Sequence, residues 1–209
     1  MSGQQIVYVV DDDAGARDSI SCLVRSAGCQ VEQYASAEEF IEAFSPEHSG
    51  CLVTDLRLRG MSGVALQEKL LAREIVLPTI IVTAYADTPM TVRAMRNGAV
   101  IVLDKPCRDQ DLWDAIMEAF ERDRQWREQR AKRCEIQERL AYLKQSERDV
   151  LDLMIAGVAN KVIASRLNVS IRTVEVRRQN VYQKMRANSL AELVRLVLEA
   201  GKPDAHAPT

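Results

Sequence analysis

Short apolar runs and longer amphipathic segments alternate through the first 110 residues. Four apolar runs are rich in β-branched residues, which is typical of buried strands, and they cover residues 6–10, 51–55, 78–83 and 99–103. Residues 29–34 instead alternate between apolar and polar positions, which predicts a half-buried strand. Between them, apolar side chains recur at helical spacing, notably after residue 13, after a capping box that starts at residue 36, and over 64–73 and 88–97. Strands and helices that alternate five times predict a parallel sheet with helices on both faces.

After residue 107 the pattern is helical throughout. No Gly or Pro occurs between Cys107 and Gly157, and acid-first pairs four residues apart, such as Asp123 and Arg127, favour a helix. We predict one long, mostly exposed helix from about residue 109 to 142, either a rigid spacer or a coiled coil that carries a signal or a dimer contact. Four shorter helices follow, at 146–157, 160–167, 171–185 and 190–199, and a capping box at Ser146 is expected to open the first.

These patterns divide the chain into four parts. Residues 1–120 form an α/β domain with a five-stranded parallel sheet. Residues 121–142 are a helical linker that continues its last helix, residues 143–201 are an all-α four-helix domain, and residues 202–209 are expected to be a disordered tail.

Composition narrows the class of protein. The chain has 209 residues, of which 47% are hydrophobic and 28% charged, as in a globular protein. No apolar run approaches the roughly 18 residues that span a bilayer, and no signal peptide is evident, so we expect a cytoplasmic protein without a membrane partner. The five cysteines are scattered, which indicates neither a disulfide framework nor a zinc site.

Charge differs between the two halves. Residues 1–120 carry 10 Lys or Arg and 18 Asp or Glu, a net charge of −8, whereas residues 121–209 carry 18 and 12, a net charge of +6. An acidic first half and a basic second half indicate two modules with different partners, and the basic module is the candidate for a polyanion such as DNA.

Polar side chains follow four of the predicted strands. Asp11 and Asp12 follow the first, Asp55 ends the third, Thr83 ends the fourth and Lys105 follows the fifth. Because the carboxyl ends of parallel strands meet at one edge of a sheet, we expect these side chains to lie together. Clustered carboxylates repel one another unless a cation intervenes, and their oxygens suit Mg²⁺, with Mn²⁺ as the alternative ion.

This cluster has the parts that phosphoryl transfer needs. A free oxygen of Asp55 can attack phosphorus and form an acyl phosphate, while Lys105 pairs with one phosphoryl oxygen and the Thr83 hydroxyl donates to another. The sequences Val-Asp-Asp-Asp, Ile-Val-Thr-Ala and Asp-Lys-Pro, together with Asp55, stand in the order and spacing of response-regulator receiver domains. Residues 1 to about 120 therefore resemble a receiver domain of the flavodoxin-like fold.

The resemblance implies a role for each residue of the cluster. Asp55 would take the phosphoryl group from a sensor histidine kinase. Asp12, Asp55 and the backbone carbonyl of Arg57 would bind the metal directly, and Asp11 would act through water. The peptide bond between Lys105 and Pro106 would be cis.

Three positions depart from the family pattern. Val102 stands where the family usually has an inward-turning aromatic residue, Cys107 replaces the usual Phe after Lys-Pro, and Leu58-Arg59 replaces a common Met-Pro. None of these departures falls on the five cluster residues themselves, so the phosphorylation pocket is complete. The side chains expected to relay a change from the pocket to the surface are altered. Tyr85 is a candidate to supply the missing aromatic side chain.

The basic half contains a short helix, a tight turn at residues 168–170 and a basic helix, which together predict a helix-turn-helix. A long motif runs through this half: Glu147-Arg148-Asp149-Val150-Leu151, Gly157, Asn160-Lys161, Ile163-Ala164, Leu167, Thr173-Val174-Glu175-Val176, Asn180-Val181 and Lys184. It resembles the LuxR-type domain, so the whole chain resembles the NarL/FixJ group of response regulators. By position, Glu175, Val176 and Gln179 would face bases, and the residues expected to contact or approach phosphates are Lys161, Arg172, Thr173, Arg177, Arg178 and Lys184.

The resemblance implies a DNA-binding regulator of a two-component system. Phosphorylation would favour a homodimer that binds an inverted repeat in a promoter, with RNA polymerase as a further partner. Two alternatives stay open: a regulator that binds DNA without phosphorylation, and a phosphotransfer sink with vestigial DNA binding. Apart from its own phosphorylation and dephosphorylation, no catalytic activity is expected.

Overall fold

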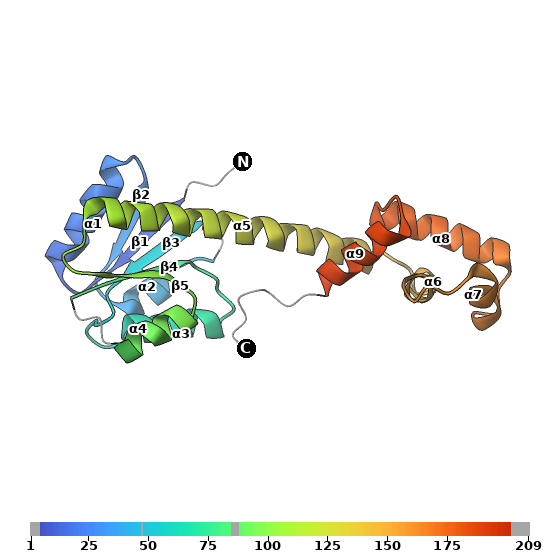
Figure 1. Cartoon of the computed structure of the whole chain (residues 1–209), viewed down its shortest axis with the longest axis horizontal. Helices are drawn as coiled ribbons and strands as arrows, with labels where there is room; N and C mark the ends of the chain where they lie inside the picture. The colour runs from blue at the N-terminus through green and yellow to red at the C-terminus, as the bar shows by residue number, and fades with distance from the viewer. Residues whose placement is uncertain (1–4, 47, 85–87, 202–209) are drawn as a thin grey trace. The chain divides into compact units, whose positions relative to one another are not determined.

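Five short strands form one parallel sheet in the first half of the chain (Figure 1). The computed structural model describes residues 5–46, 48–84 and 88–201. The strands are β1 (Ile6–Val10), β2 (Gln30–Tyr34), β3 (Gly50–Thr54), β4 (Thr79–Thr83) and β5 (Ala99–Asp104), and their order in the sheet is β2-β1-β3-β4-β5. The predicted five-stranded parallel sheet is confirmed, with each strand within one or two residues of its expected bounds.

Helices cover both faces of this sheet. On one face, α1 (Ala14–Ser26) and the start of α5 (Asp109–Ala141) pack on a core that includes Val9, Val53 and Ile116. The other face is covered by α2 (Ala37–Ala43), α3 (Gly63–Ala72) and α4 (Thr88–Arg96). Because all five strands are parallel, their carboxyl ends lie along one edge of the sheet, and the loops after them meet there.

Local sequence sets the helix starts near that edge. The side chains of Asp13, Ser36 and Ser62 each accept a hydrogen bond from a backbone N–H three residues later, so they cap α1, α2 and α3. At Gly63 a Cβ atom would lie only 2.2 Å from the carbonyl oxygen of Asp55. Glycine at this position therefore lets α3 begin directly against the backbone of Asp55.

The expected long helix is one element, and over residues 121–142 it is mostly exposed as predicted, but Asp123 is an exception. The carboxylate of Asp123 is fully buried and accepts hydrogen bonds from Ser49 Oγ (2.5 Å), Gly50 N (3.1 Å) and Arg127 Nε (2.9 Å). Arg127 also donates to the carbonyl of His48. An acid-first pair that looks like a surface pair in the sequence thus anchors α5 at the amino-terminal end of β3.

The later part of α5 belongs to a second body. The chain divides into two compact units between Arg127 and Glu128, within α5. In the second unit, Ile136 is buried, and Leu140 packs against the same core. The linker expected at 121–142 is therefore shared between the two units, because its apolar and buried polar residues pack on each.

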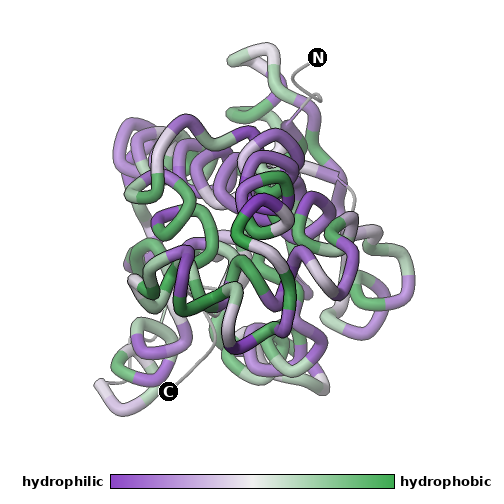
Figure 2. The backbone as a smooth tube through the Cα atoms, turned by 90° about the vertical axis from the view of Figure 1, so that its right-hand side faces the viewer, coloured by the Kyte–Doolittle hydropathy of each residue, from purple (hydrophilic) through white to green (hydrophobic). Residues whose placement is uncertain are grey.

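The second unit is helical, with α6 (Gln145–Ile155), α7 (Asn160–Arg166), α8 (Ile171–Met185) and α9 (Leu190–Ala200) after α5. Its buried residues come from all five helices, and Figure 2 shows hydrophobic and hydrophilic positions alternating along the helical turns. Ser170 caps α8, because its hydroxyl accepts a hydrogen bond from Thr173 N at 3.0 Å. The all-α domain predicted from the sequence is confirmed.

The predicted cap at Ser146 is wrong. The residue that precedes α6 is Lys144, and the carboxylate of Glu147 accepts a hydrogen bond from the Lys144 backbone N–H at 2.9 Å. Ser146 lies inside the first turn, because the helix starts two residues earlier than its sequence suggested.

Two expectations concern residues outside the described part of the chain, namely the aromatic substitute Tyr85 and the tail at 202–209. Within the described residues, no helix is both long and apolar enough to cross a membrane.

Candidate functional site

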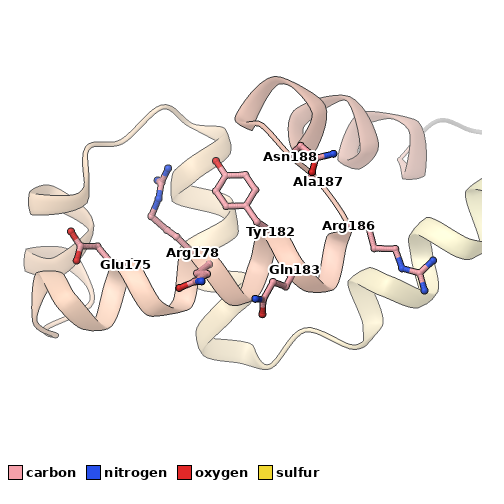
Figure 3. A pocket seen from close by; sticks show the side chains of 8 residues that line it. Glu175, Arg178, Tyr182, Gln183, Arg186, Ala187 and Asn188 are labelled. Carbon is pink, nitrogen blue, oxygen red and sulfur yellow. The ribbon is translucent and has the colours of Figure 1, made fainter.

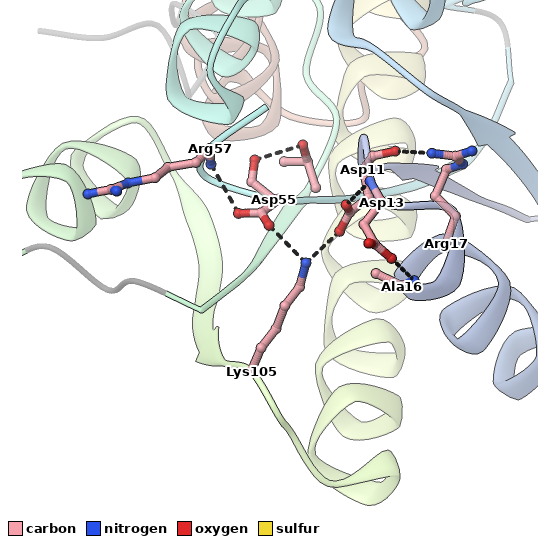
Figure 4. Close-up of polar contacts among 8 residues, drawn as sticks. Asp11, Asp13, Ala16, Arg17, Asp55, Arg57 and Lys105 are labelled. Atoms are coloured by element: carbon pink, nitrogen blue, oxygen red, sulfur yellow. Dashed lines mark hydrogen bonds and ion pairs between the residues drawn. The ribbon is translucent and has the colours of Figure 1, made fainter. Parts of the chain in front are cut away.

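Three of the predicted site residues meet at the carboxyl edge of the sheet. Lys105 Nζ lies 2.5 Å from Asp11 Oδ2 and 2.8 Å from Asp55 Oδ2. Figure 4 shows the lysine side chain reaching between the two carboxylates, which follow neighbouring strands β1 and β3. Residues that are 94 and 50 positions apart in the sequence are thus brought into direct contact.

Backbone contacts hold these side chains in place. The N–H of Asp55 donates to the carbonyl of Val10 (3.1 Å), which continues the pairing of β3 with β1. The N–H of Lys105 donates to the carbonyl of Thr83 (2.8 Å), and the Lys105–Pro106 peptide bond is cis, as the resemblance implied. Thr83 is buried at the end of β4, beside β5. The site is therefore built on the rigid ends of four strands.

Burial and charge act together at this edge. The Asp11 side chain is 3% exposed, Asp55 14% and Lys105 23%. Burial lowers the pKa of Lys105, but its hydrogen bonds to Asp11 and Asp55 outweigh this, and the pKa is raised overall. The lysine is therefore a firmly charged cation beside Asp55, as neutralisation of a phosphoryl group requires.

Asp12 and the backbone of Arg57, the other predicted metal ligands, make contacts of their own. Asp12 Oδ2 pairs with Arg59 Nε at 3.0 Å, on the exposed side of the edge. The backbone N–H of Arg57 donates to Asp55 Oδ1 at 3.0 Å. Among the described residues, no three acidic, cysteine or histidine side chains are arranged as a metal site.

The donor set nevertheless fits Mg²⁺ in its chemistry. Asp11, Asp12 and Asp55 offer only oxygen atoms, which this hard cation prefers. The carboxylates presently share the positive charges of Lys105 and Arg59. A divalent cation could take over part of that neutralisation, because the net charge of these five side chains is negative.

Val102 and Cys107, which depart from the family pattern, each pack against a hydrophobic cluster. Val102 is half-buried and packs against the cluster under α4 that contains Leu56, Ile81 and Ala94. Cys107 packs against the core on the opposite face, under α1 and α5. Through this cluster, Leu56, the residue after Asp55, is packed together with Val102 and with Ala94 of α4.

On the second unit, most predicted DNA-contact residues lie on the surface of α7 and α8. Lys161, Arg172, Glu175, Val176 and Gln179 are exposed, and Val176 is 51% exposed although it is apolar. Thr173, Arg177 and Arg178 are half-buried, and the Thr173 hydroxyl lies 2.8 Å from the capping hydroxyl of Ser170.

An open groove of about 720 Å³ runs along this face of α8. Figure 3 shows Glu175, Arg178 and Tyr182 projecting from successive turns of the helix. The groove ends at Arg186 and Asn188, beyond the end of α8. Tyr182 and Asn188 were not predicted, although Tyr182 follows Gln179 by three residues and therefore shares its face.

Lys184 has a different environment from the other predicted phosphate contacts. Its Nζ atom lies 2.7 Å from Glu147 Oε2 and 3.4 Å from the Tyr142 carbonyl oxygen. Glu147 is 4% exposed. Lys184 therefore ties α8 to the start of α6, and its charge is already paired within the unit.

Comparisons with known proteins match both halves of the chain. A family model described as the response regulator receiver domain matches residues 7–117, and one described as the luxR family of bacterial regulatory proteins matches residues 141–197. The chain belongs to the NarL/FixJ-type response regulators. Nodulation protein W of Bradyrhizobium diazoefficiens is 42% identical over 195 residues, which cover 93% of this chain and 86% of the relative. The transcriptional regulatory protein FixJ of Azorhizobium caulinodans is 43% identical over 93% of this chain and 92% of its own.

Solved structures give the same result. The response regulator StyR has a TM-score of 0.84 and 42% identity, over 94% of this chain and 100% of that one. Full-length FixJ from B. japonicum has a TM-score of 0.57 and 39% identity, over 96% and 98%.

This NarL/FixJ-type regulator is thus a two-component response regulator of transcription, with a receiver domain and a LuxR-type DNA-binding domain. Its family consists of regulators and not of enzymes. The receiver domain implies a sensor kinase as a partner, and receiver domains generally bind Mg²⁺ in the phosphorylation site. Regulation without phosphorylation and a phosphotransfer sink are not favoured, because the relatives that align over both domains are transcriptional regulators.

Proposed function

We propose that Asp55 is the phosphoacceptor of this regulator. A carboxylate oxygen of Asp55 attacks the phosphorus atom of a phosphohistidine on the kinase, the P–N bond breaks, and an acyl phosphate forms. The observation that carries this proposal is the position of Lys105 Nζ, 2.8 Å from Asp55 Oδ2 and 2.5 Å from Asp11 Oδ2. A fixed cation at this point can pair with a phosphoryl oxygen as negative charge arrives.

Two other parts of the edge support the same reaction. The Thr83 hydroxyl would donate to a second phosphoryl oxygen, since β4 ends beside the strand that carries Lys105. Asp12, Asp55 and the carbonyl of Arg57 would hold Mg²⁺ directly, with Asp11 acting through water and Mn²⁺ as a substitute. When bound, the metal would neutralise charge on the phosphoryl group.

The change at Asp55 would reach the surface through α4 and β5. Val102 packs with Leu56 and with Ala94 of α4. Because this cluster is close-packed, a shift at the end of β3 would displace its side chains. Valine fills less space than the usual aromatic residue, so we expect a smaller side-chain displacement than in other receivers.

Phosphorylation would then favour a homodimer through the surface formed by α4 and β5. Val92 and Met95 of α4 are 44% and 46% exposed, and Ile101 of β5 is 37% exposed. In addition, β5 is an edge strand of the sheet. Exposed apolar side chains next to an open strand edge are suited to pairing with a second copy of the chain.

In the second unit, α8 would enter the major groove of DNA. Glu175, Val176 and Gln179 would face bases, while Lys161, Arg172, Thr173, Arg177 and Arg178 would contact or approach phosphates. We propose that two such units bind an inverted repeat in a promoter, in the cytoplasm, where RNA polymerase is the further partner. Lys184 would hold α8 in place and not contact a phosphate, because Glu147 already pairs with it.

Selection of DNA from a random pool, with and without beryllofluoride and Mg²⁺, tests this function. We expect an inverted repeat to be enriched, and enrichment to increase with beryllofluoride, which occupies the place of the phosphoryl group. Asp55→Asn serves as the matched control, since it should select the same repeat without responding to beryllofluoride. Equal enrichment in all samples would contradict control by phosphorylation, and no enrichment would contradict sequence-specific binding.

A further inference from the structure

The end of α5 is joined to the carboxyl end of α8 by a small polar network. Arg139 Nη1 donates to the carbonyl of Met185, the last residue of α8, at 3.3 Å. Its Nη2 donates to Glu135 Oε1 at 2.5 Å, and the same oxygen lies 3.5 Å from Arg186 Nη1. The Arg139 side chain is only 19% exposed. The guanidinium group is therefore held between its own helix and the end of α8.

This contact has the chemistry of a helix cap. The last carbonyl groups of a helix have no partner within the helix, and the carboxyl end carries partial negative charge. The half-buried guanidinium group of Arg139 meets both needs. A neutral side chain of α5 also contacts the end of α9, because Gln137 Nε2 donates to the carbonyl of Ala200 at 3.3 Å. Ile136, the residue before Gln137, enters the core that contains Val181 and Met185 of α8.

The contact with α5 lies next to an unusual backbone conformation at the end of α8. Arg186 follows α8 in the left-handed conformation, with φ of 52° and ψ of 42°. This conformation is unfavourable for a residue with a Cβ atom and persists where surrounding contacts fix it. The backbone N–H groups of Arg186 and Ala187 close the helix, and the contacts of α5 with Met185 and Arg186 add to them in holding this end of α8.

We infer that Arg139 is a positioning residue for DNA recognition, which fixes the end of α8 and thereby the angle at which Gln179 is presented to DNA. This inference rests on the proposal that α8 reads DNA. Gln179 lies six residues before Met185, about 9 Å along the helix axis. A tilt at the end of α8 thus displaces the base-reading side chains, although Arg139 itself lies outside the groove that they line.

A purely structural cap would give different results from a positioning residue, and DNA binding separates the two. The full chain with beryllofluoride and Mg²⁺ is titrated with the duplex it selects and with a shuffled duplex of equal length, at several salt concentrations. For Arg139→Ala we expect about tenfold weaker binding to the selected duplex and unchanged binding to the shuffled one. The slope of log K against log salt should not change, because no phosphate contact is removed.

Three further variants complete the test. Lys132→Ala removes a positive charge from an exposed position two turns earlier on α5 and should leave both affinities unchanged. Arg139→Lys should restore most of the binding, because it keeps a charged donor for Met185. Glu135→Gln, at an exposed position, should fold even if Arg139→Ala does not, and should lose about threefold on the selected duplex.

The inference is overturned if Arg139→Ala binds the selected duplex like the wild type. It is also overturned if both duplexes weaken in parallel with loss of folded protein, or if a folded Glu135→Gln variant shows no loss. A wild-type chain that selects no sequence would instead contradict the proposed function, and the inference would fall with it.

Discussion

Each unit of the molecule contains a lysine paired with a buried carboxylate, yet the two arrangements differ. In the receiver, Lys105 lies between Asp11 and Asp55 at distances of 2.5 and 2.8 Å. In the DNA-binding unit, Lys184 lies 2.7 Å from Glu147, whose carboxylate also accepts the backbone N–H of Lys144. The lysine-to-carboxylate distances are similar, so distance alone does not separate a reaction site from a structural contact.

The surroundings separate them. Lys105 faces two carboxylates at the ends of neighbouring strands, and its backbone N–H donates to the buried residue Thr83; a third carboxylate, Asp12, follows Asp11 in the chain. The three carboxylates there exceed the two positive charges of Lys105 and Arg59 by one, which leaves the edge able to take a cation. Around Glu147, one carboxylate meets one lysine and one helix start, so its hydrogen bonds are satisfied within the fold. An excess of negative charge at the ends of the strands thus indicates a reaction site, whereas a balanced ion pair indicates a contact that stabilises the fold.

The largest expected difference concerns removal of each lysine. Lys184→Met should lower the free energy of unfolding of the DNA-binding unit by about 2–3 kcal/mol, because Glu147 keeps its charge in a buried place. Lys105→Met should cost the receiver less in the presence of Mg²⁺ but should abolish the response to beryllofluoride. Hydrogen exchange resolved by peptide measures each unit separately, with the exposed Lys161→Met as control. Equal losses of unfolding free energy in the two units would contradict the distinction between a reaction site and a structural pair.

Magnesium should act on one cluster alone. Binding to the folded receiver at a concentration one hundred times its Kd adds about 2.7 kcal/mol of stability. We expect this gain in the peptides of residues 5–127 and none in those of residues 145–200, and Asp55→Asn should reduce it. A similar gain in the DNA-binding unit would show that the effect of Mg²⁺ is not specific to the carboxylate edge.

The two pairs should also fail at opposite ends of the pH scale. Burial raises the pKa of Glu147, but its bonds to Lys184 and to Lys144 N outweigh this, and the pKa is lowered overall. Its contribution is complete above the ordinary glutamate pKa of about 4.3 and is lost as the pH falls through the lowered value.

For Lys105 the sign is reversed. Its raised pKa means that its contribution is complete below the ordinary lysine value of about 10.4 and is lost as the pH rises through the raised value. Urea unfolding of each unit across the pH scale measures both effects. Glu147→Gln should weaken the loss of stability at acid pH in the DNA-binding unit only. The same change in the receiver would contradict the assignment of this pH dependence to Glu147.

The smallest effect is expected where a pair is neither buried nor surrounded by excess charge. Arg122 and Glu118 lie 2.7 Å apart on α5, with side chains 44% and 54% exposed. Because water screens such a pair, Glu118→Gln should change the unfolding free energy by less than about 0.5 kcal/mol. A larger loss in a urea titration would mean that exposure does not determine the contribution of these pairs.

The sequence was sufficient for the receiver site because its residues follow strands, and parallel strands bring their ends together. Asp11, Asp55 and Lys105 could be placed in contact without knowledge of any side-chain packing. The pairing of Lys184 with Glu147 could not, since it depends on how α6 packs against α8, and helical spacing alone does not report that. Asp123 is a similar case, because its spacing from Arg127 looks the same on a buried helix face as on an exposed one.

The account rests on a phosphoryl group at Asp55, and mass spectrometry after incubation with acetyl phosphate and Mg²⁺ tests that claim directly. Wild-type protein should gain one phosphoryl group, on the peptide that contains Asp55, and the modification should be labile to base as an acyl phosphate is. Asp55→Asn should gain none. Equal incorporation by the two proteins, or a phosphoryl group on another residue, would contradict the account.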